Sequence, residues 1–221
     1  MAQKTILSTN QKRFLDLVLK EPYILKNYYW TGGTVLAEFY LNHRESYDID
    51  LFNEKQEVDL GSIEKFIYSV GKKLKASKID HRRYLGLHSI VLQLPKEELK
   101  VDFNYYPFLR INRGKNWYGL EIDSLEDIAV NKVHTLSMKP RTRDFVDLYF
   151  ILQDKQFILD KLIILAKAKF DWHIDPIQFG HNLAQVVAYK DIPRMLVPFN
   201  HKHMEDFFLQ LAKSLKKEIF K

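Results

Sequence analysis

Two aspartates separated by one residue, Asp48-Ile49-Asp50, constrain this chain more than any other feature of its sequence. They follow the turn Gly32-Gly33 and a short predicted helix, and the residues around them are typical of a strand. Alternate residues of a strand project from the same face, so the two carboxylates are predicted to lie side by side. They repel each other unless a cation lies between them. The glycine turn, at the start of the helix, supplies backbone N–H groups for a phosphate.

A third acidic residue, Asp102, lies on a later predicted strand in which apolar and polar residues alternate strictly. Its polar face carries Lys100, Asp102 and Asn104, which is unusual in an apolar strand unless that face lines a site. Mg²⁺ or Mn²⁺ accepts carboxylate oxygens and substrate phosphates together. We therefore expect Asp48, Asp50 and Asp102 to be catalytic metal ligands, with Asp102 also orienting or deprotonating an attacking hydroxyl. An exposed strand face alone would explain the first two aspartates, but not the third or the glycine turn.

The order of the predicted elements divides the chain into two lobes. Up to residue 123, helices over 8–20, 34–41 and 60–74 are interspersed with strands over 28–31, 48–52, 78–85, 88–94, 99–106 and 118–122. From residue 124 onward only helices are predicted, over 124–137, 142–152, 159–170, 176–189 and 205–220. We predict an α+β fold, with a mixed-sheet lobe over residues 1–123 and an all-helical C-terminal lobe over residues 124–221.

Composition narrows the class of protein. The chain has 221 residues, 46% of them hydrophobic and 28% charged, which is ordinary for a folded domain with a sizeable core. The absence of Cys excludes disulfides and thiolate metal sites and fits a reducing compartment. We see no signal peptide and no apolar run of membrane-spanning length, so we expect a cytoplasmic protein without a membrane partner. The net charge of +6 favours a polyanionic partner, though only moderately.

Charged residues of the helical lobe and of one connecting segment are further candidates. Lys132 is a suitable point charge for a triphosphate. Arg143, Asp144 and Asp147 have helical spacing, and from that spacing alone they are best explained as surface ion pairs. Arg44 lies just before the aspartate pair, where a phosphate contact and an ordinary surface position are equally acceptable.

Several segments together resemble a known family. The runs 29–34, 42–44 and 47–52, which contain the glycine turn and the aspartate pair, look like the first motif of the AbiEii/AbiGii nucleotidyltransferase-like toxins. Lys100-Val101-Asp102 resembles the second motif, 124–132 the third and 143–149 the last. That family belongs to the DNA polymerase β-like nucleotidyltransferase superfamily. Where the superfamily often has Gly-Ser at the phosphate turn, this chain has Gly33-Thr34, which retains the hydroxyl.

The resemblance implies a polymerase β-like fold and transfer of a nucleotide from an NTP. It implies catalytic roles for Lys132, which would bind the phosphates, and for Asp144, which would position that lysine. With the residue chemistry above, it makes Gly32, Gly33, Thr34, Arg44, Lys132 and Arg143 our candidates for nucleotide binding. For some relatives it implies addition of nucleotides to the 3′ end of tRNA, and it implies an antitoxin encoded nearby.

Three functions follow as hypotheses. The first is a metal-dependent nucleotidyltransferase that acts on RNA as a toxin of a toxin–antitoxin or phage abortive-infection system. The second keeps the reaction but changes the acceptor to a small molecule or a protein hydroxyl. The third is a nucleotide- or RNA-binding module without activity, which the presence of all three aspartates disfavours.

Overall fold

The computed structural model describes residues 5–154 and 156–219, with backbone alone over 216–219. The chain folds into two compact units. Unit 1 comprises residues 1–40 and 46–124, and unit 2 comprises residues 41–45 and 125–221. The short segment Leu41–Glu45, predicted as part of the first lobe, thus belongs with the helices of the second.

Unit 1 is built on a seven-stranded mixed sheet with the strand order β3-β4-β5-β2-β1-β7-β6. The strands are β1 (Tyr29–Thr31), β2 (Ile49–Asn53), β3 (Lys78–Tyr84), β4 (Leu87–Gln93), β5 (Glu98–Tyr105), β6 (Asn116–Trp117) and β7 (Leu120–Ile122). β2 pairs in parallel with β5, and β1 with β7, whereas the other neighbours are antiparallel. The parallel pair β2–β5 brings two segments distant in sequence into contact, and this pair carries Asp50 and Asp102.

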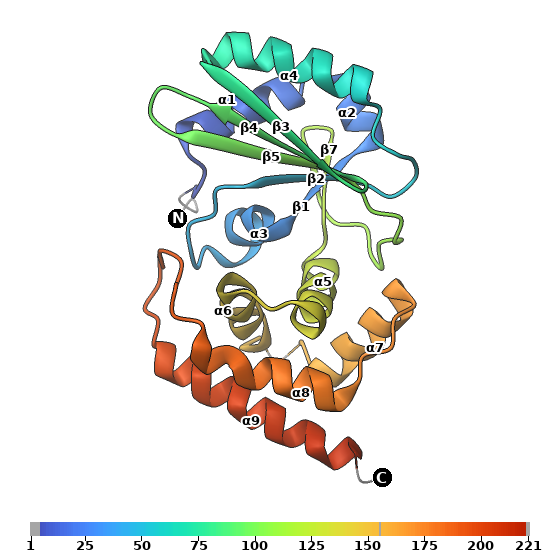
Figure 1. Ribbon diagram of the computed structural model, residues 1–221, viewed down its shortest axis with the longest axis vertical. Coiled ribbons are helices and arrows are strands. Elements are labelled where there is room, and N and C mark those ends of the chain that lie inside the picture. The colour runs from blue at the N-terminus through green and yellow to red at the C-terminus, as the bar shows by residue number, and fades with distance from the viewer. Residues whose placement is uncertain (1–4, 155, 220–221) are drawn as a thin grey trace. The chain divides into compact units, whose positions relative to one another are not determined.

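Helices cover both faces of this sheet. In Figure 1, α1 (Thr9–Val18), α2 (Pro22–Asn27) and α4 (Leu60–Leu74) lie over one face, and α3 (Gly32–Val35) lies on the other. α3 continues as η1 (Leu36–Leu41), a π-helix. Apolar residues of α4 at helical spacing, such as Ile63, Phe66 and Val70, are buried in the core between helix and sheet.

α1 also fixes the chain just before the aspartate pair. It begins with a capping box, in which Ser8 Oγ accepts from the Gln11 N–H and the Gln11 side chain accepts from the Ser8 N–H. The buried Gln11 amide then donates to the carbonyl oxygens of Ser46 and Tyr47, at 3.1 and 3.0 Å. A single side chain therefore caps the helix and holds the start of the aspartate segment.

Unit 2 contains only helices. These are α5 (Leu125–Met138), α6 (Thr142–Leu152), α7 (Leu159–Phe170), α8 (Pro176–Ala184), the 3₁₀ turn η2 (Gln185–Ala188) and α9 (His201–Ile219). α5 packs against α6, α7 and α8, and α8 runs beside α9 (Figure 1). The buried aromatic rings of Phe145, Phe179 and Phe208 contribute to its core. Among the described residues, no helix combines the length and the apolar character that crossing a bilayer requires.

The structure confirms the predicted α+β class and differs from the sequence predictions in several details. α2 was not predicted, although Pro22 at its first position is a typical helix start. The predicted helix over 34–41 becomes a short α-helix followed by the π-helix. The predicted helix over 176–189 ends early as a 3₁₀ turn, and the last helix begins four residues before the predicted start, at His201.

Candidate active site

The glycine turn is built against one of the aspartates. β1 ends at Thr31, whose register partner on β2 is Asp50. Gly32 follows with a φ of 84°, a conformation that side chains with a Cβ adopt only with strain. A Cβ placed on Gly32 would lie 2.1 Å from Asp50 Oδ2. Both the conformation and the space therefore require glycine here, and the turn backbone lies directly against the carboxylate.

The Thr34 side chain contacts the segment that carries the aspartate pair. Its side chain is fully buried, and its hydroxyl donates to the carbonyl oxygen of Asp48. The same hydroxyl oxygen lies 2.9 Å from Ser46 Oγ. These contacts connect α3 to the segment that carries the aspartate pair. They favour a structural role for Thr34 over the predicted phosphate contact.

The three aspartates are neighbours in unit 1. Asp50 and Asp102 are register partners in the parallel pair β2–β5, so their side chains share one face of the sheet. Asp48 directly precedes β2. Asp102 is buried, and its Oδ1 has no hydrogen-bond partner among the described residues. A buried carboxylate oxygen without a donor is costly, so this atom is a candidate for binding a ligand.

Lys100, for which the sequence predicted no separate role, lies between two of these carboxylates. Its Nζ is 2.8 Å from Asp102 Oδ2 and 3.4 Å from Asp48 Oδ2. Burial acts to lower the pKa of the Lys100 ammonium, but the hydrogen bond to Asp102 and the charges of the three aspartates outweigh it and raise that pKa. The lysine therefore supplies the positive charge that neighbouring carboxylates require.

The donor set fits a hard divalent cation. Asp48, Asp50 and Asp102 present carboxylate oxygens on adjacent segments, and the unpartnered Oδ1 of Asp102 is a free ligand atom. In the described part of the chain, no three His, Cys, Asp or Glu side chains are already gathered as a metal-ligand cluster. Binding would thus require the carboxylates to converge and Lys100 to move aside. The metal site stays a prediction.

Unit 2 holds the predicted lysine in a buried ion network. Lys132 on α5 lies with its Nζ 2.7 Å from Asp144 Oδ1 and 2.6 Å from Asp147 Oδ2, both on α6. Arg141, at the start of α6, also pairs with Asp144, at 2.8 Å. Burial acts to raise the pKa of Asp144, but Lys132 and Arg141 lower it below its usual value. The contact agrees with the positioning role that the resemblance implied for Asp144.

Asp147 is the centre of this network. Its carboxylate is fully buried and accepts two hydrogen bonds from Arg44, Nε at 2.6 Å and Nη2 at 2.8 Å. His43 Nε2 lies 2.9 Å from the same carboxylate. The expectation that Asp144 and Asp147 form surface pairs is therefore wrong, because α6 turns both inward against α5 and the segment 41–45.

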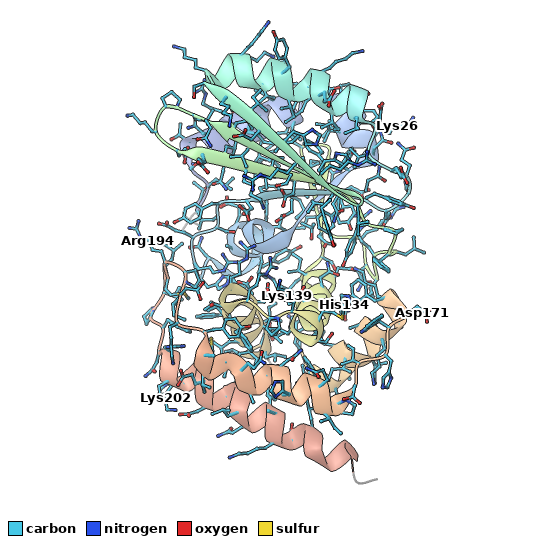
Figure 2. All side chains as sticks on the ribbon, viewed as in Figure 1. Lys26, His134, Lys139, Asp171, Arg194 and Lys202 are labelled. Carbon is cyan, nitrogen blue, oxygen red and sulfur yellow. The ribbon has the colours of Figure 1, made fainter. Side chains whose placement is uncertain are left out.

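The contacts of Arg44 favour a structural role over the predicted phosphate contact. Its guanidinium is 3% exposed and is hydrogen-bonded both to Asp147 and to the carbonyl oxygen of Glu45. Glu45 in turn donates its N–H to the carbonyl oxygen of Arg194 and pairs with that side chain, which is labelled in Figure 2. Arg143, by contrast, is an exposed residue of α6, and its predicted role in nucleotide binding stays a prediction.

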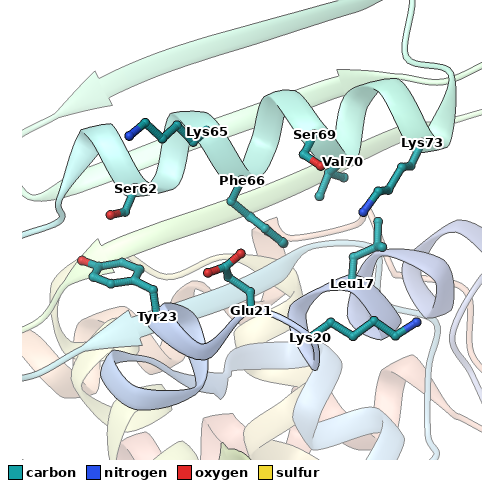
Figure 3. A pocket seen from close by; sticks show the side chains of 10 residues that line it. All are labelled: Leu17, Lys20, Glu21, Tyr23, Ser62, Lys65, Phe66, Ser69, Val70 and Lys73. Atoms are coloured by element: carbon teal, nitrogen blue, oxygen red, sulfur yellow. The ribbon is translucent and has the colours of Figure 1, made fainter.

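One cavity of unit 1 lies away from the aspartates. Figure 3 shows this cavity of about 320 Å³ between α1, α2 and α4, lined by Lys20, Lys65, Phe66 and Lys73 among others. Ile49 and Leu51 of β2 are buried on the face opposite Asp50.

Replacing Gly32 with alanine tests the close approach at the turn. We expect Gly32→Ala to lower the free energy of unfolding by about 1–3 kcal/mol and to displace the Asp50 carboxylate, with loss of most nucleotidyl transfer. Gly119→Ala is a matched control, because Gly119 also has a positive φ (96°) but its Cβ would meet only Leu25, at 3.6 Å. Urea unfolding and a transfer assay on both variants separate the two effects. Equal activity in the two variants would contradict the assignment.

Known proteins resemble this chain in sequence and in fold. An uncharacterized protein of Aquifex aeolicus (strain VF5), aq_aa25, is 29% identical over 167 residues, which cover 74% of this chain and 76% of that protein. Two crystal structures from Helicobacter pylori share the fold. JHP933 superposes with a TM-score of 0.58 and 17% identity over 96% of this chain and 94% of its own. A candidate nucleotidyltransferase superposes with a TM-score of 0.58 and 18% identity over 96% and 97%.

A family model for the nucleotidyl transferase AbiEii toxin of type IV toxin–antitoxin systems matches residues 26–217. The match extends from just before β1 into α9, so it includes the glycine turn, the three aspartates and the Lys132 network. It confirms the resemblance carried by the sequence motifs, and the likeness in fold is consistent with it. The chain therefore belongs to the AbiEii nucleotidyltransferase toxin family.

Proposed function

We propose that this protein transfers a nucleotidyl group from an NTP to a hydroxyl group of RNA, in a reaction that requires Mg²⁺ or Mn²⁺. Nucleotidyl transfer itself follows from the family. The observation that carries the finer proposal is the set of three aspartates beside the Gly32 turn, with one carboxylate oxygen of Asp102 buried and unpartnered among the described residues. The net charge of +6 supports a polyanionic acceptor. Among RNAs we propose the 3′ end of tRNA, as the family resemblance implies.

Each group of residues would have its own role. Asp48, Asp50 and Asp102 would hold the divalent ion, which when bound neutralises phosphate charge and polarises the phosphoryl group. Backbone N–H groups of the Gly32–Gly33 turn would bind phosphate oxygens. Asp102 would accept the proton of the acceptor hydroxyl, directly or through water. Lys132, held by Asp144 and Asp147, would bind the triphosphate as a positioned charge.

The family also implies a cognate antitoxin, because a type IV system pairs the toxin with one. We propose that toxicity in cells results from modification of the RNA acceptor. Expression of the wild-type protein and of an Asp50→Asn variant in the same host tests this directly. Growth arrest by both the wild-type protein and Asp50→Asn would show that toxicity does not depend on nucleotidyl transfer.

A labelling assay tests the reaction and its acceptor. Purified protein is incubated with Mg²⁺, bulk tRNA and each α-labelled NTP in turn, beside the Asp50→Asn variant. We expect label on tRNA with a preferred nucleotide and none with the variant. Label on added protein or on a small molecule, but not on RNA, would contradict the proposal that RNA is the acceptor. If the affinity for NTP depended neither on Mg²⁺ nor on the Asp50 substitution, the protein would be a binding module without activity.

Lys100 supplies a separate test of the metal site. We expect Lys100→Met to tighten Mn²⁺ binding about tenfold, because the ammonium group that now lies between Asp48 and Asp102 competes with a divalent ion for the same charges. Electron paramagnetic resonance of free Mn²⁺ measures this without any turnover. Lys96→Met, at an exposed lysine between β4 and β5, is the control. An unchanged Kd in Lys100→Met would argue against metal binding at these carboxylates.

A further inference from the structure

A row of residues crosses the sheet from the aspartates to its edge. Asp50 on β2 is the register partner of Asp102 on β5, Asp102 that of Ser89 on β4, and Ser89 that of Arg82 on β3. Directly opposed residues of neighbouring strands project from the same face. The row therefore places Arg82 on the face that carries the aspartates, and β3 is the last strand of the sheet.

Tyr84 extends this row at the sheet edge. It lies two residues after Arg82 on the same strand, so it shares the face, and the residue is 74% exposed. On β4 the residues of this face, including Leu87 and Ser89, are only partly covered. The outer end of the row is therefore accessible to a ligand.

The opposite face is buried on β4, whereas on β3 its residues Ile79, His81 and Arg83 are exposed. His88, Ile90 and Leu92 of β4 are buried there. Ile79 of β3 lies close to α4, since a Cβ on Gly71 of that helix would lie 2.7 Å from its Cδ1. On β4, therefore, the face with the aspartates is the more accessible of the two.

The side chains at the outer end of the row are available for binding. Within the described ranges, neither the Arg82 nor the Tyr84 side chain takes part in a hydrogen bond or an ion pair. The nearby acid Asp80 is already neutralised by Lys78, whose Nζ lies 2.6 Å from its Oδ1. Neighbouring strands are about 4.8 Å apart, so Arg82 begins about 10 Å from Asp102 along the row.

We infer that Arg82 and Tyr84 bind the nucleotides that precede the reacting hydroxyl at the 3′ end of the RNA acceptor. A guanidinium pairs with phosphate oxygens, and an exposed tyrosine ring stacks on a base, which is how single-stranded nucleic acid is held. Ser89, between Arg82 and Asp102, supplies a hydroxyl for the intervening backbone. This inference rests on the proposed RNA acceptor and deepens it by locating the path of the strand.

Binding and transfer by Arg82→Ala and Tyr84→Ala test the inference. Fluorescence anisotropy with labelled tRNA, without NTP, is expected to show about tenfold weaker binding for Tyr84→Ala. Arg82→Ala is expected to weaken binding and to reduce the slope of log K against log salt by about 0.7, the value for one phosphate contact on a single strand. In the transfer assay the KM for tRNA should rise in both variants while the KM for the NTP stays unchanged. A rise in the KM for the NTP alone would indicate that the donor, rather than the RNA acceptor, binds along this row, and it would overturn the inference.

Arg83→Ala is the matched control, because Arg83 is the adjacent exposed arginine of β3 and projects from the opposite face, beside its register partner His88. We expect it to bind and label tRNA as the wild type does. Thermal unfolding of all three variants checks that the edge strand remains folded. This inference would be overturned if the wild-type protein labelled RNA but Arg82→Ala and Tyr84→Ala bound and labelled it as well as Arg83→Ala does. The proposed function would then still stand. A wild-type protein that neither binds nor labels RNA would remove the RNA acceptor, and this inference with it.

Discussion

Asp50→Asn is expected to reduce nucleotidyl transfer about a thousandfold or more while the protein remains folded. Asparagine has nearly the same shape as aspartate, so it fits against the Gly32 turn that approaches Asp50 so closely. It removes one negative charge from the group formed by Asp48, Asp50 and Asp102. Stabilisation of phosphate charge by a bound metal amounts to several kcal/mol, and each 1.36 kcal/mol of barrier is tenfold in rate.

Initial rates with saturating NTP and acceptor measure the effect, and circular dichroism with thermal unfolding checks the fold. Asp16→Asn is the control, because Asp16 is an exposed carboxylate on α1 and receives the same chemical change. We expect full activity from it. If Asp50→Asn kept a tenth or more of the wild-type rate, the assignment of Asp50 to the catalytic site would be wrong.

Asp147→Ala is expected to destabilise unit 2 by about 3–5 kcal/mol. The substitution leaves Arg44 and Lys132 buried without the carboxylate that now accepts hydrogen bonds from both. Removing one partner of a buried ion network has effects of this size, because Arg44 stays desolvated without this carboxylate and Lys132 retains only its pair with Asp144. Urea unfolding followed by circular dichroism measures the change.

Asp206→Ala is the matched control on α9. Asp206 pairs with Lys202 at 3.0 Å, but both side chains are largely exposed. Exposed pairs contribute little because water screens them, so we expect almost no change in the free energy of unfolding. A similar small effect for Asp147→Ala would show that the buried network contributes nothing to stability.

The same network predicts sensitivity to acid. Burial acts to raise the pKa of Asp147, but the charges of Arg44 and Lys132 and the hydrogen bonds from Arg44 and His43 hold that pKa well below its usual range. A pKa that is lower in the folded state than in the unfolded state stabilises the fold above the unfolded value, about 3.9 for Asp. The contribution is then lost progressively as the pH falls from about 4 through the folded pKa. Urea unfolding of Asp147→Ala and wild type at decreasing pH should therefore show their difference shrinking.

Local patterns were sufficient for most elements of the fold. The strict alternation of β5 and the apolar spacing of α6 and α7 predicted those elements to within a residue or two, because the residues that define each period are neighbours in sequence. α2 was missed, and the helix predicted over 34–41 was not recognised as π-helical in its η1 part. Each has only six residues, too few for a period to be distinguished from chance.

The aspartate pair and the glycine turn were also evident from the sequence, because each is a motif of two or three residues whose geometry is local. That Asp102 lies beside Asp50 required the parallel pairing of β2 with β5. The role of Lys100 required the same pairing, because its contact with Asp48 joins residues 52 positions apart. Spacing showed only that Lys100 and Asp102 share a face.

The burial of charge was decided by tertiary structure alone. The spacing of Asp144 and Asp147 suits an exposed helix as well as a buried one, and their partners distinguish the two. Arg44 reaches Asp147 from 103 positions earlier in the chain, in a segment that packs with the helices of unit 2. The sequence by itself determined most of the elements and the motif of glycine turn and aspartate pair, because their geometry depends on residues that are close in sequence. Which charges are desolvated together depends on packing between distant segments, because only that packing removes water from around them.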